Sequence, residues 1–113
     1  NHPNVLKAID VIQEEDFVYI VTEYLPQGNL AEYITKLGMI PEAQAIEIFK
    51  QIVDGYDHIF DLQIYHRDLK PHNILFDKNF RPVLSDFGYC ENTGYLPKPS
   101  LEYNVGSPGF MAP

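Results

Sequence analysis

Residues 66–73 read HRDLKPHN, and this stretch decides how the rest of the chain is interpreted. It places an acid, Asp68, a cation, Lys70, and an amide, Asn73, at fixed offsets in one predicted loop. A second acid, Asp86, follows Asn73 by thirteen residues as the first letter of DFG. Such a set suits phosphoryl transfer, in which a hydroxyl is oriented for in-line attack while metal ions and a cation neutralise the phosphate oxygens. Asp68 would accept the hydroxyl proton, and Asn73 and Asp86 would hold the metals.

The order HRDLxxxN followed by DFG resembles the catalytic core of eukaryotic protein kinases. Lys70, two residues after the acid, is similar to the lysine of serine/threonine kinases and not to tyrosine kinases. The resemblance covers essentially all 113 residues and implies a two-lobed α+β protein kinase-like fold, present in part. Residues 1–24 would form the end of the small lobe, a β-hairpin and the start of the hinge. Residues 25–113 would form the mainly helical large lobe from the hinge to the activation segment.

The resemblance implies transfer of the ATP γ-phosphate to Ser or Thr hydroxyls of protein substrates, with ATP and Mg²⁺ as cofactors. Asp68 would be the base, and Lys70 would reach the transferred phosphate from the substrate side. Ser107, in the sequence GSPGFMAP at residues 106–113, would hydrogen-bond near both of them in a substrate-docking turn. Arg67, beside the base, would bind an anion on a neighbouring loop through a bidentate fork.

The run EYLPQGNL at residues 23–30 breaks the preceding strand pattern with Pro and Gly, and it resembles the hinge between the kinase lobes. By that resemblance, Glu23 and Leu25 would offer main-chain hydrogen bonds to the adenine, and Thr22 would be the gatekeeper residue. Leu75 would pack under the adenine. Without the later motifs, an ordinary strand-to-helix loop would be the preferred interpretation.

The segments before the loop predict a hairpin and two helices. Residues 5–12 and 17–22 are β-branched runs around a polar turn and would pair antiparallel. Asn29, with Glu32 three residues later, predicts a capped helix start, and Gly38 suits the C-terminal cap of that helix. Pro41 opens a longer helix. The apolar residues of the longer helix recur at spacings of three and four and predict one buried stripe: Ala45, Ile46, Phe49, Ile52, Val53, Tyr56 and Phe60.

The segments after the loop predict a second hairpin. Residues 74–76 and 83–85 flank a long turn, so this hairpin would carry Asn73 and Asp86 toward one place. The freedom of Gly88 at positive φ would let the chain turn sharply and aim the Asp86 carboxylate at a magnesium ion.

From Gly88 onward the chain is rich in Gly and Pro and has little periodicity, which predicts a long loop similar to a kinase activation segment. Its phosphate acceptors are Ser100, Thr93 and Tyr103, in that order of preference. Arg67 has no evident partner in its own loop, so a phosphate in this segment would hold the guanidinium and raise activity. The alternative is that Arg67 bonds loop carbonyls and the segment becomes ordered without modification.

Composition narrows the class of protein. The formal net charge of −8 and the pI near 4.7 argue against nucleic-acid binding, which needs clustered Lys and Arg. The single cysteine, Cys90, cannot form an internal disulfide. No apolar run approaches the roughly 20 residues that span a bilayer. The resemblance to kinases implies ATP and a protein substrate as partners, and we expect an intracellular, cytoplasmic protein. Composition gives no indication of oligomeric state.

The chain ends suggest an internal piece of a longer protein. Asn1 is not a start methionine, and Pro113 falls within a motif similar to the kinase sequence APE. The glycine-rich phosphate loop, the strand Lys and the helix Glu of kinases would precede this piece, so it is not expected to be active alone. One alternative is a catalytically inactive kinase-like scaffold or regulatory binding module. Another, a small-molecule phosphotransferase, is disfavoured by Arg67, by Lys70 with Pro71, and by the docking turn.

Overall fold

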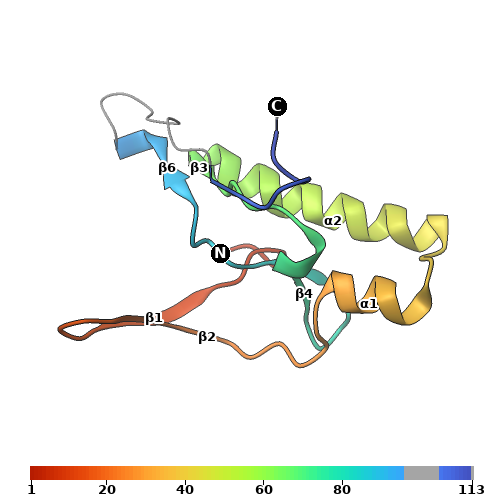
Figure 1. Ribbon diagram of the computed structural model, residues 1–113, viewed down its shortest axis with the longest axis horizontal. Helices are drawn as coiled ribbons and strands as arrows, with labels where there is room; N and C mark the ends of the chain where they lie inside the picture. Colours follow the sequence, from red (N-terminus) through yellow and green to blue (C-terminus); the bar gives the residue numbers. More distant parts are fainter. Residues whose placement is uncertain (96–104, 113) are drawn as a thin grey trace.

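The computed structural model describes residues 1–95 and 105–112 (Figure 1). Its two α-helices are α1, Leu30–Leu37, and α2, Glu42–Asp61, and short 3₁₀ helices follow at Pro71–Asn73 (η1) and Thr93–Tyr95 (η2). The described strands form three antiparallel pairs: β1 (Ala8–Gln13) with β2 (Val18–Thr22), β3 (Ile64–Tyr65) with β6 (Glu91–Asn92), and β4 (Ile74–Phe76) with β5 (Pro82–Leu84). No described helix combines the length and the hydropathy needed to cross a bilayer.

The first hairpin forms as predicted, but its first strand is shorter. β1 begins at Ala8 because Val5 forms a parallel bridge with Leu84 of β5 instead of pairing with β2. The Leu6 amide donates to the Leu84 carbonyl at 2.9 Å, and the Leu84 amide donates to the Asn4 carbonyl at 2.8 Å. The N-terminal residues therefore extend the β4–β5 pair, and β1 and β2 project away from it (Figure 1).

Helix α1 begins and ends through the caps that the sequence predicts. Asn29 Oδ1 accepts from the Glu32 amide at 2.9 Å, and the Glu32 carboxylate accepts from the Asn29 amide at 3.4 Å. This reciprocal pair satisfies two helix-end donors. At the other end Gly38 has φ 76° and its amide donates to the Ile34 carbonyl at 2.8 Å, a left-handed closure that glycine permits without strain.

Helix α2 begins at Glu42 as predicted, but the predicted buried stripe is right only in part. Ile52 and Tyr56 are half-buried against the core, whereas Ile46, Phe49, Val53 and Phe60 are exposed. Phe49 is 65% exposed and Phe60 50% exposed, whereas Ile48 and Ile59 are buried. Apolar residues lie on two adjacent faces of this helix, and a spacing of three and four fits both of them. Ile48 and Ile59 of α2 belong to the buried core. Its other members come from α1, β4 and β5: Leu30, Ile74, Phe76 and Leu84.

A close backbone contact holds the N-terminal turn against α2. Gly55 is buried in the middle of this helix, and a Cβ added there would lie 2.7 Å from the Asn4 carbonyl oxygen. Asn4 is 5% exposed, and its side-chain amide donates to the Pro82 carbonyl at 2.8 Å. Asn4 thus joins the turn to both α2 and β5, and only a glycine at position 55 leaves room for it.

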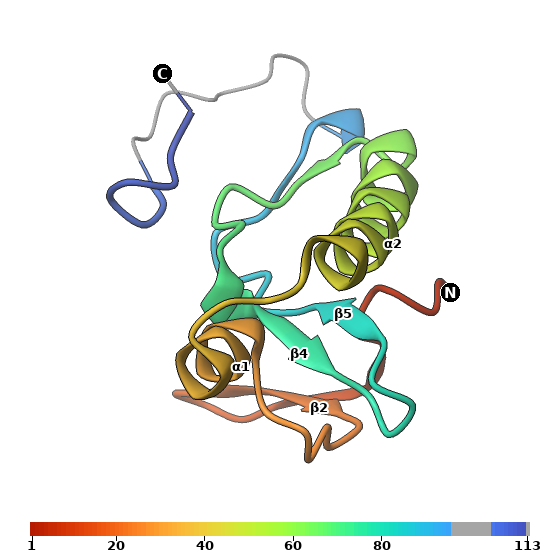
Figure 2. The same ribbon diagram turned by 90° about the vertical axis from the view of Figure 1, so that its right-hand side faces the viewer.

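The β4–β5 hairpin carries two of the predicted site residues to one place. Its strands pair from Ile74 with Leu84 to Phe76 with Pro82, and they lie between α2 on one side and the β1–β2 hairpin on the other (Figure 2). At the open end, the Ser85 amide and hydroxyl donate to the Asn73 carbonyl at 2.9 and 3.0 Å. Asp86 follows Ser85, so these hydrogen bonds bring the backbone before Asp86 close to Asn73.

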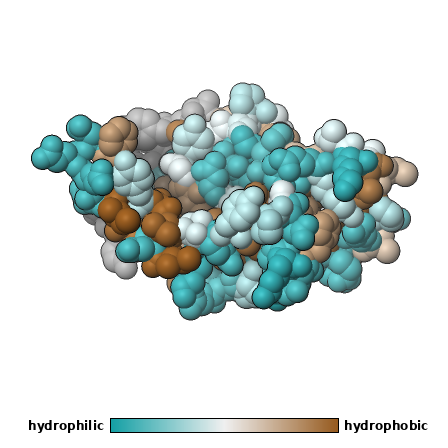
Figure 3. All heavy atoms as spheres, turned by 90° about the horizontal axis from the view of Figure 1, so that it is seen from below, coloured by the Kyte–Doolittle hydropathy of each residue, from teal (hydrophilic) through white to brown (hydrophobic). Residues whose placement is uncertain are grey.

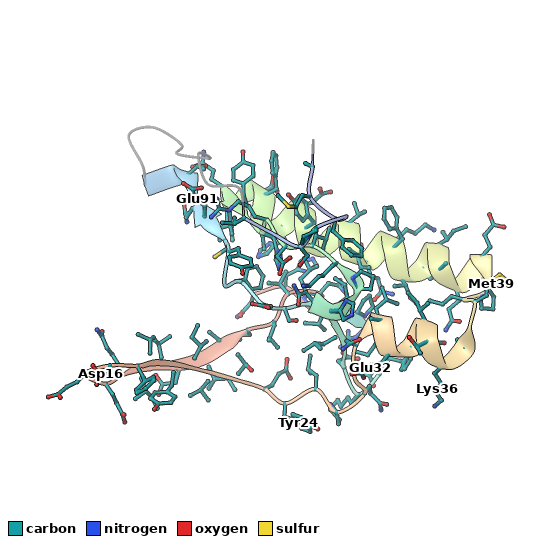
Figure 4. All side chains as sticks on the ribbon, in the orientation of Figure 1. Asp16, Tyr24, Glu32, Lys36, Met39 and Glu91 are labelled. Carbon is teal, nitrogen blue, oxygen red and sulfur yellow. The ribbon has the colours of Figure 1, made fainter. Side chains whose placement is uncertain are left out.

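The β1–β2 hairpin leaves its apolar side chains exposed. Every residue of both strands is exposed, including Ile9 at 64% and Ile20 at 66%. Brown hydrophobic spheres gather over this part of the surface in Figure 3, and Figure 4 marks Asp16 at its tip. An apolar surface of this kind needs a covering partner. The predicted lobe division after residue 24 stays a prediction.

Candidate active site

The loop between β3 and β4 is organised around a buried histidine. His66 is fully buried, and its Nδ1 accepts from the Asp68 amide at 3.1 Å. Because Nδ1 is an acceptor, the ring proton of neutral His66 lies on Nε2, which donates to the Ser85 carbonyl at 2.8 Å. The ring also meets Phe87 edge to face, with centroids 4.9 Å apart. His66 therefore joins the backbone of Asp68 to the segment that carries Asp86.

Asp68 is a buried residue, only 5% exposed, and hydrogen-bond donors surround its carboxylate. Ser107 Oγ donates to Oδ1 at 2.6 Å, and Asn73 Nδ2 donates to Oδ2 at 3.0 Å and to the Asp68 carbonyl at 2.9 Å. Lys70 Nζ lies 3.7 Å from Oδ2. The Ser107 hydrogen bond above all, with help from Asn73 and Lys70, holds the pKa of Asp68 below its usual value against the opposing effect of burial. Asp68 is therefore ionised at neutral pH.

Ser107 bridges the acid and the cation of the loop. Its hydroxyl accepts from Lys70 Nζ at 2.5 Å while donating to Asp68. The segment that carries Ser107 also approaches the loop backbone, because a Cβ on Gly106, at φ 129°, would lie 2.7 Å from the Arg67 carbonyl oxygen. The sequence places Ser107 near Asp68 and Lys70, and the structure has it there; its catalytic role stays a prediction.

Asn73 and Asp86 present the oxygens that suit a cation. The Asn73 amide nitrogen is engaged by Asp68, which leaves the amide oxygen as the available acceptor. Asp86 is exposed and has φ 58°, and its Oδ1 accepts from the Gly88 amide at 3.2 Å. The left-handed residue of this turn is therefore Asp86 and not Gly88, since aspartate tolerates positive φ when its side chain bonds the local backbone.

These two residues fit a magnesium site of the kind that a nucleotide completes. Groups of three or more His, Cys, Asp or Glu placed to hold a metal do not occur among the described residues. Magnesium needs only one or two protein oxygens when phosphates and water supply the others. The Asn73 amide oxygen and the Asp86 carboxylate would therefore hold the ion, while Lys70 stays with Asp68 and Ser107.

The structure places two of the four predicted adenine contacts, Glu23 and Leu25, in one cavity. Thr22, at the end of β2, is exposed and its hydroxyl donates to the Glu23 carbonyl at 3.2 Å. Glu23 and the buried Leu25 line a cavity of about 470 Å³ with Val83, but Thr22 and Leu75 are not among its lining residues. Leu75 pairs with Val83 in the β4–β5 hairpin.

Arg67 has two partners that the sequence did not reveal. Its Nε donates to the Tyr89 carbonyl at 2.6 Å, and its Nη1 lies 3.3 Å from Glu91 Oε2. The pairing of Tyr65 with Glu91 brings this segment beside the loop, and such a long-range pairing has no local sequence signal. The Tyr89 contact agrees with the alternative in which Arg67 bonds loop carbonyls.

Of the predicted phosphate acceptors, Thr93 is the one that the structure describes. Its hydroxyl donates to the Gln63 carbonyl at 3.3 Å, and its amide donates to the same oxygen at 3.0 Å. Ser100 and Tyr103 lie outside the described residues.

The loop between β3 and β4 thus gathers an acid, a lysine and an asparagine beside the β4–β5 hairpin and Ser107. The model of the family described as protein kinase domain matches residues 1–113, and the chain belongs to that family. The family and the partial α+β kinase fold predicted from the sequence are thereby confirmed.

The similar proteins carry the name serine/threonine-protein kinase. The one named GIN4, from Saccharomyces cerevisiae, is 41% identical over 115 residues that cover all of this chain and 10% of that protein. Mouse SIK1 is 38% identical, with all of this chain and 14% of that protein covered. ATG1c from Arabidopsis thaliana is 37% identical, again over all of this chain and 16% of that protein. The chain thus spans between a tenth and a sixth of the length of these relatives.

Proposed function

We propose that the protein containing this chain transfers the γ-phosphate of ATP to Ser or Thr hydroxyls of protein substrates. The observation that carries the proposal is the position of the Ser107 hydroxyl. It lies 2.6 Å from the Asp68 carboxylate and 2.5 Å from the Lys70 ammonium. A place that holds one hydroxyl between an ionised acid and a cation is suited to hold another in the same way. The names of the similar proteins support Ser and Thr as the acceptors.

Asp68 would orient the attacking hydroxyl. Ser107 and Asn73 each take one lone pair of a carboxylate that offers about four, so acceptor capacity remains for a substrate. Because the Ser107 hydrogen bond, first among several causes, lowers the pKa of Asp68, the carboxylate is a weak base before reaction. It would take the proton late, when the bond to phosphorus has begun to form and the hydroxyl has become acidic.

The other residues would manage charge and position. Protein kinases generally use ATP and magnesium, and bound ATP supplies the phosphoryl group while magnesium neutralises its oxygens. Asn73 and Asp86 would hold the ion, and the Lys70 ammonium would attract the transferred phosphate from the side of Ser107. Dependence on ATP also supports the intracellular, cytoplasmic location that we propose for the protein.

Asp68→Asn in the complete protein tests the proposal against an inactive kinase-like scaffold. The amide keeps the shape but cannot accept a proton, so phosphoryl transfer should fall at least about a hundredfold while ATP affinity stays within about twofold. Asp57→Asn is the matched control, because Asp57 is an exposed residue of α2. Equal transfer by wild type and Asp68→Asn would contradict the role of Asp68, and ATP binding without transfer by the wild type would favour the scaffold.

A further inference from the structure

A shielded ion pair lies directly beside the proposed base. The side chains of Arg67 and Glu91 are 21% and 12% exposed, and their charged atoms are 3.3 Å apart. Arg67 also donates to the Tyr89 carbonyl at 2.6 Å, so one guanidinium bonds two positions of the segment that follows DFG. Salt screens a pair that is shielded from water much less than an exposed one.

Glu91 is held in a defined place by the backbone around it. Glu91, which Figure 4 labels, belongs to β6. This strand pairs with β3 through Tyr65 opposite Glu91 and Ile64 opposite Asn92. The Thr93 amide continues this pairing. The carboxylate is thus presented by a strand, and a charge on a rigid element positions its partner more closely than one on a free loop.

The backbone of Arg67 lies between Asp68 and the segment that carries Ser107. Its φ is 64°, a conformation that a non-glycine residue keeps only when its surroundings hold it. The next residue is Asp68, and the Arg67 carbonyl lies against Gly106, next to Ser107. A change in the Arg67 backbone would therefore move the acid on one side and its serine partner on the other.

We propose that Glu91 is a positioning residue whose carboxylate supplies the anion that holds Arg67, so that the site is assembled without a phosphate in the activation segment. This inference rests on the proposed kinase function. A phosphate would bring about −1.5 to −2 charges to a guanidinium that already faces a carboxylate, and like charges repel. Phosphorylation of the activation segment therefore adds little activity in this protein, in contrast to the expectation drawn from Arg67 alone.

Substitutions at both ends of the pair test this proposal in the complete protein. Glu91→Gln keeps the side-chain shape and removes the charge, and it should lower kcat roughly tenfold while KM for ATP stays within about twofold. Glu91→Asp keeps the charge and should retain most of kcat. The matched control is Glu47→Gln, because Glu47 is 68% exposed and pairs with Lys50 on the surface of α2.

Two further measurements separate positioning from a general loss of stability. Arg67→Ala combined with Glu91→Gln should be no slower than the worse single variant, because both changes remove one interaction. Phosphatase treatment of the wild type should leave kcat within about twofold. Additive losses, an unchanged kcat in Glu91→Gln, or loss of wild-type activity after phosphatase treatment would each overturn the proposal, the last of them even where Glu91→Gln fails to fold.

A readout without catalysis keeps this inference distinct from the proposed function. Amide hydrogen exchange of residues 64–70 should quicken in Glu91→Gln and in Arg67→Ala, and no further in the double variant. If the wild type transfers no phosphate, the proposed function fails while exchange still reports on the pair. If exchange in residues 64–70 is the same in all four proteins, Glu91 does not position the loop.

Discussion

Replacing Gly55 by alanine should destabilise this domain, although the same change in most helices stabilises them. Alanine is favoured over glycine in a helix interior by about 1 kcal/mol. Here the added Cβ would lie 2.7 Å from the Asn4 carbonyl oxygen and 3.0 Å from the Asn4 Cβ. Asn4 cannot easily yield, because its side chain bonds Pro82 and its carbonyl bonds Leu84. Overpacking of about 3 kcal/mol against that gain leaves a net loss of about 2 kcal/mol.

Hydrogen exchange in the complete protein measures this effect locally. A loss of about 2 kcal/mol should speed exchange of the slowest α2 amides roughly 30-fold. The N-terminal turn, whose Leu6 amide bonds Leu84, should lose protection with them. Asp57→Ala, an exposed change in the same helix, should not speed exchange. Slower exchange in Gly55→Ala than in the wild type would refute the argument from close approach.

The titratable groups and the metal ligand give three further expectations. Burial first, and then the charge of His58, lowers the pKa of His2, so its neutral form stabilises the fold above pH 6.5 and that contribution is lost as pH falls through the lowered pKa. The exchange protection factors of the N-terminal turn, which correct for the base catalysis of exchange, should therefore be smaller at pH 5.5 than at pH 7.5, and equal factors would argue against this effect. Ser107→Ala removes the largest cause of the low pKa of Asp68, so the acid limb of the pH–rate profile should move to higher pH, and an unmoved limb would argue against this cause. Asp86→Asn should weaken nucleotide binding in the presence of magnesium but not in its absence, as measured by titration calorimetry; equal loss in both would remove Asp86 from the metal site.

Local patterns predicted the elements of the fold well, because their signals lie within a few residues of one another. The Asn29 and Glu32 cap, the Gly38 stop and the start of α2 all follow from neighbouring residues. The buried face of α2 did not, because Ile48 and Phe49 are one residue apart and only tertiary packing chooses between them. Packing of the N-terminal residues on β5 likewise makes the first strand begin later than expected, at Ala8.

The site was predictable where its residues share one loop and not where they meet across the fold. Asp68, Lys70 and Asn73 lie within six residues, and the structure brings them together with Ser107. Glu91 was missed, since it reaches Arg67 only through the pairing of β3 with β6. Because glycine is the usual left-handed residue, the sequence predicts positive φ at Gly88. The structure has it at Asp86, whose side chain accepts from the Gly88 amide and stabilises that conformation.

Phosphoamino-acid analysis of the complete protein tests the central claim most directly. The protein would be incubated with magnesium, γ-labelled ATP and a mixture of protein substrates, and the labelled residues would then be identified. The account predicts label on serine or threonine, and none above background with Asp68→Asn. Label on tyrosine or on a small molecule, or no transfer by a wild-type protein that still binds ATP, would contradict it.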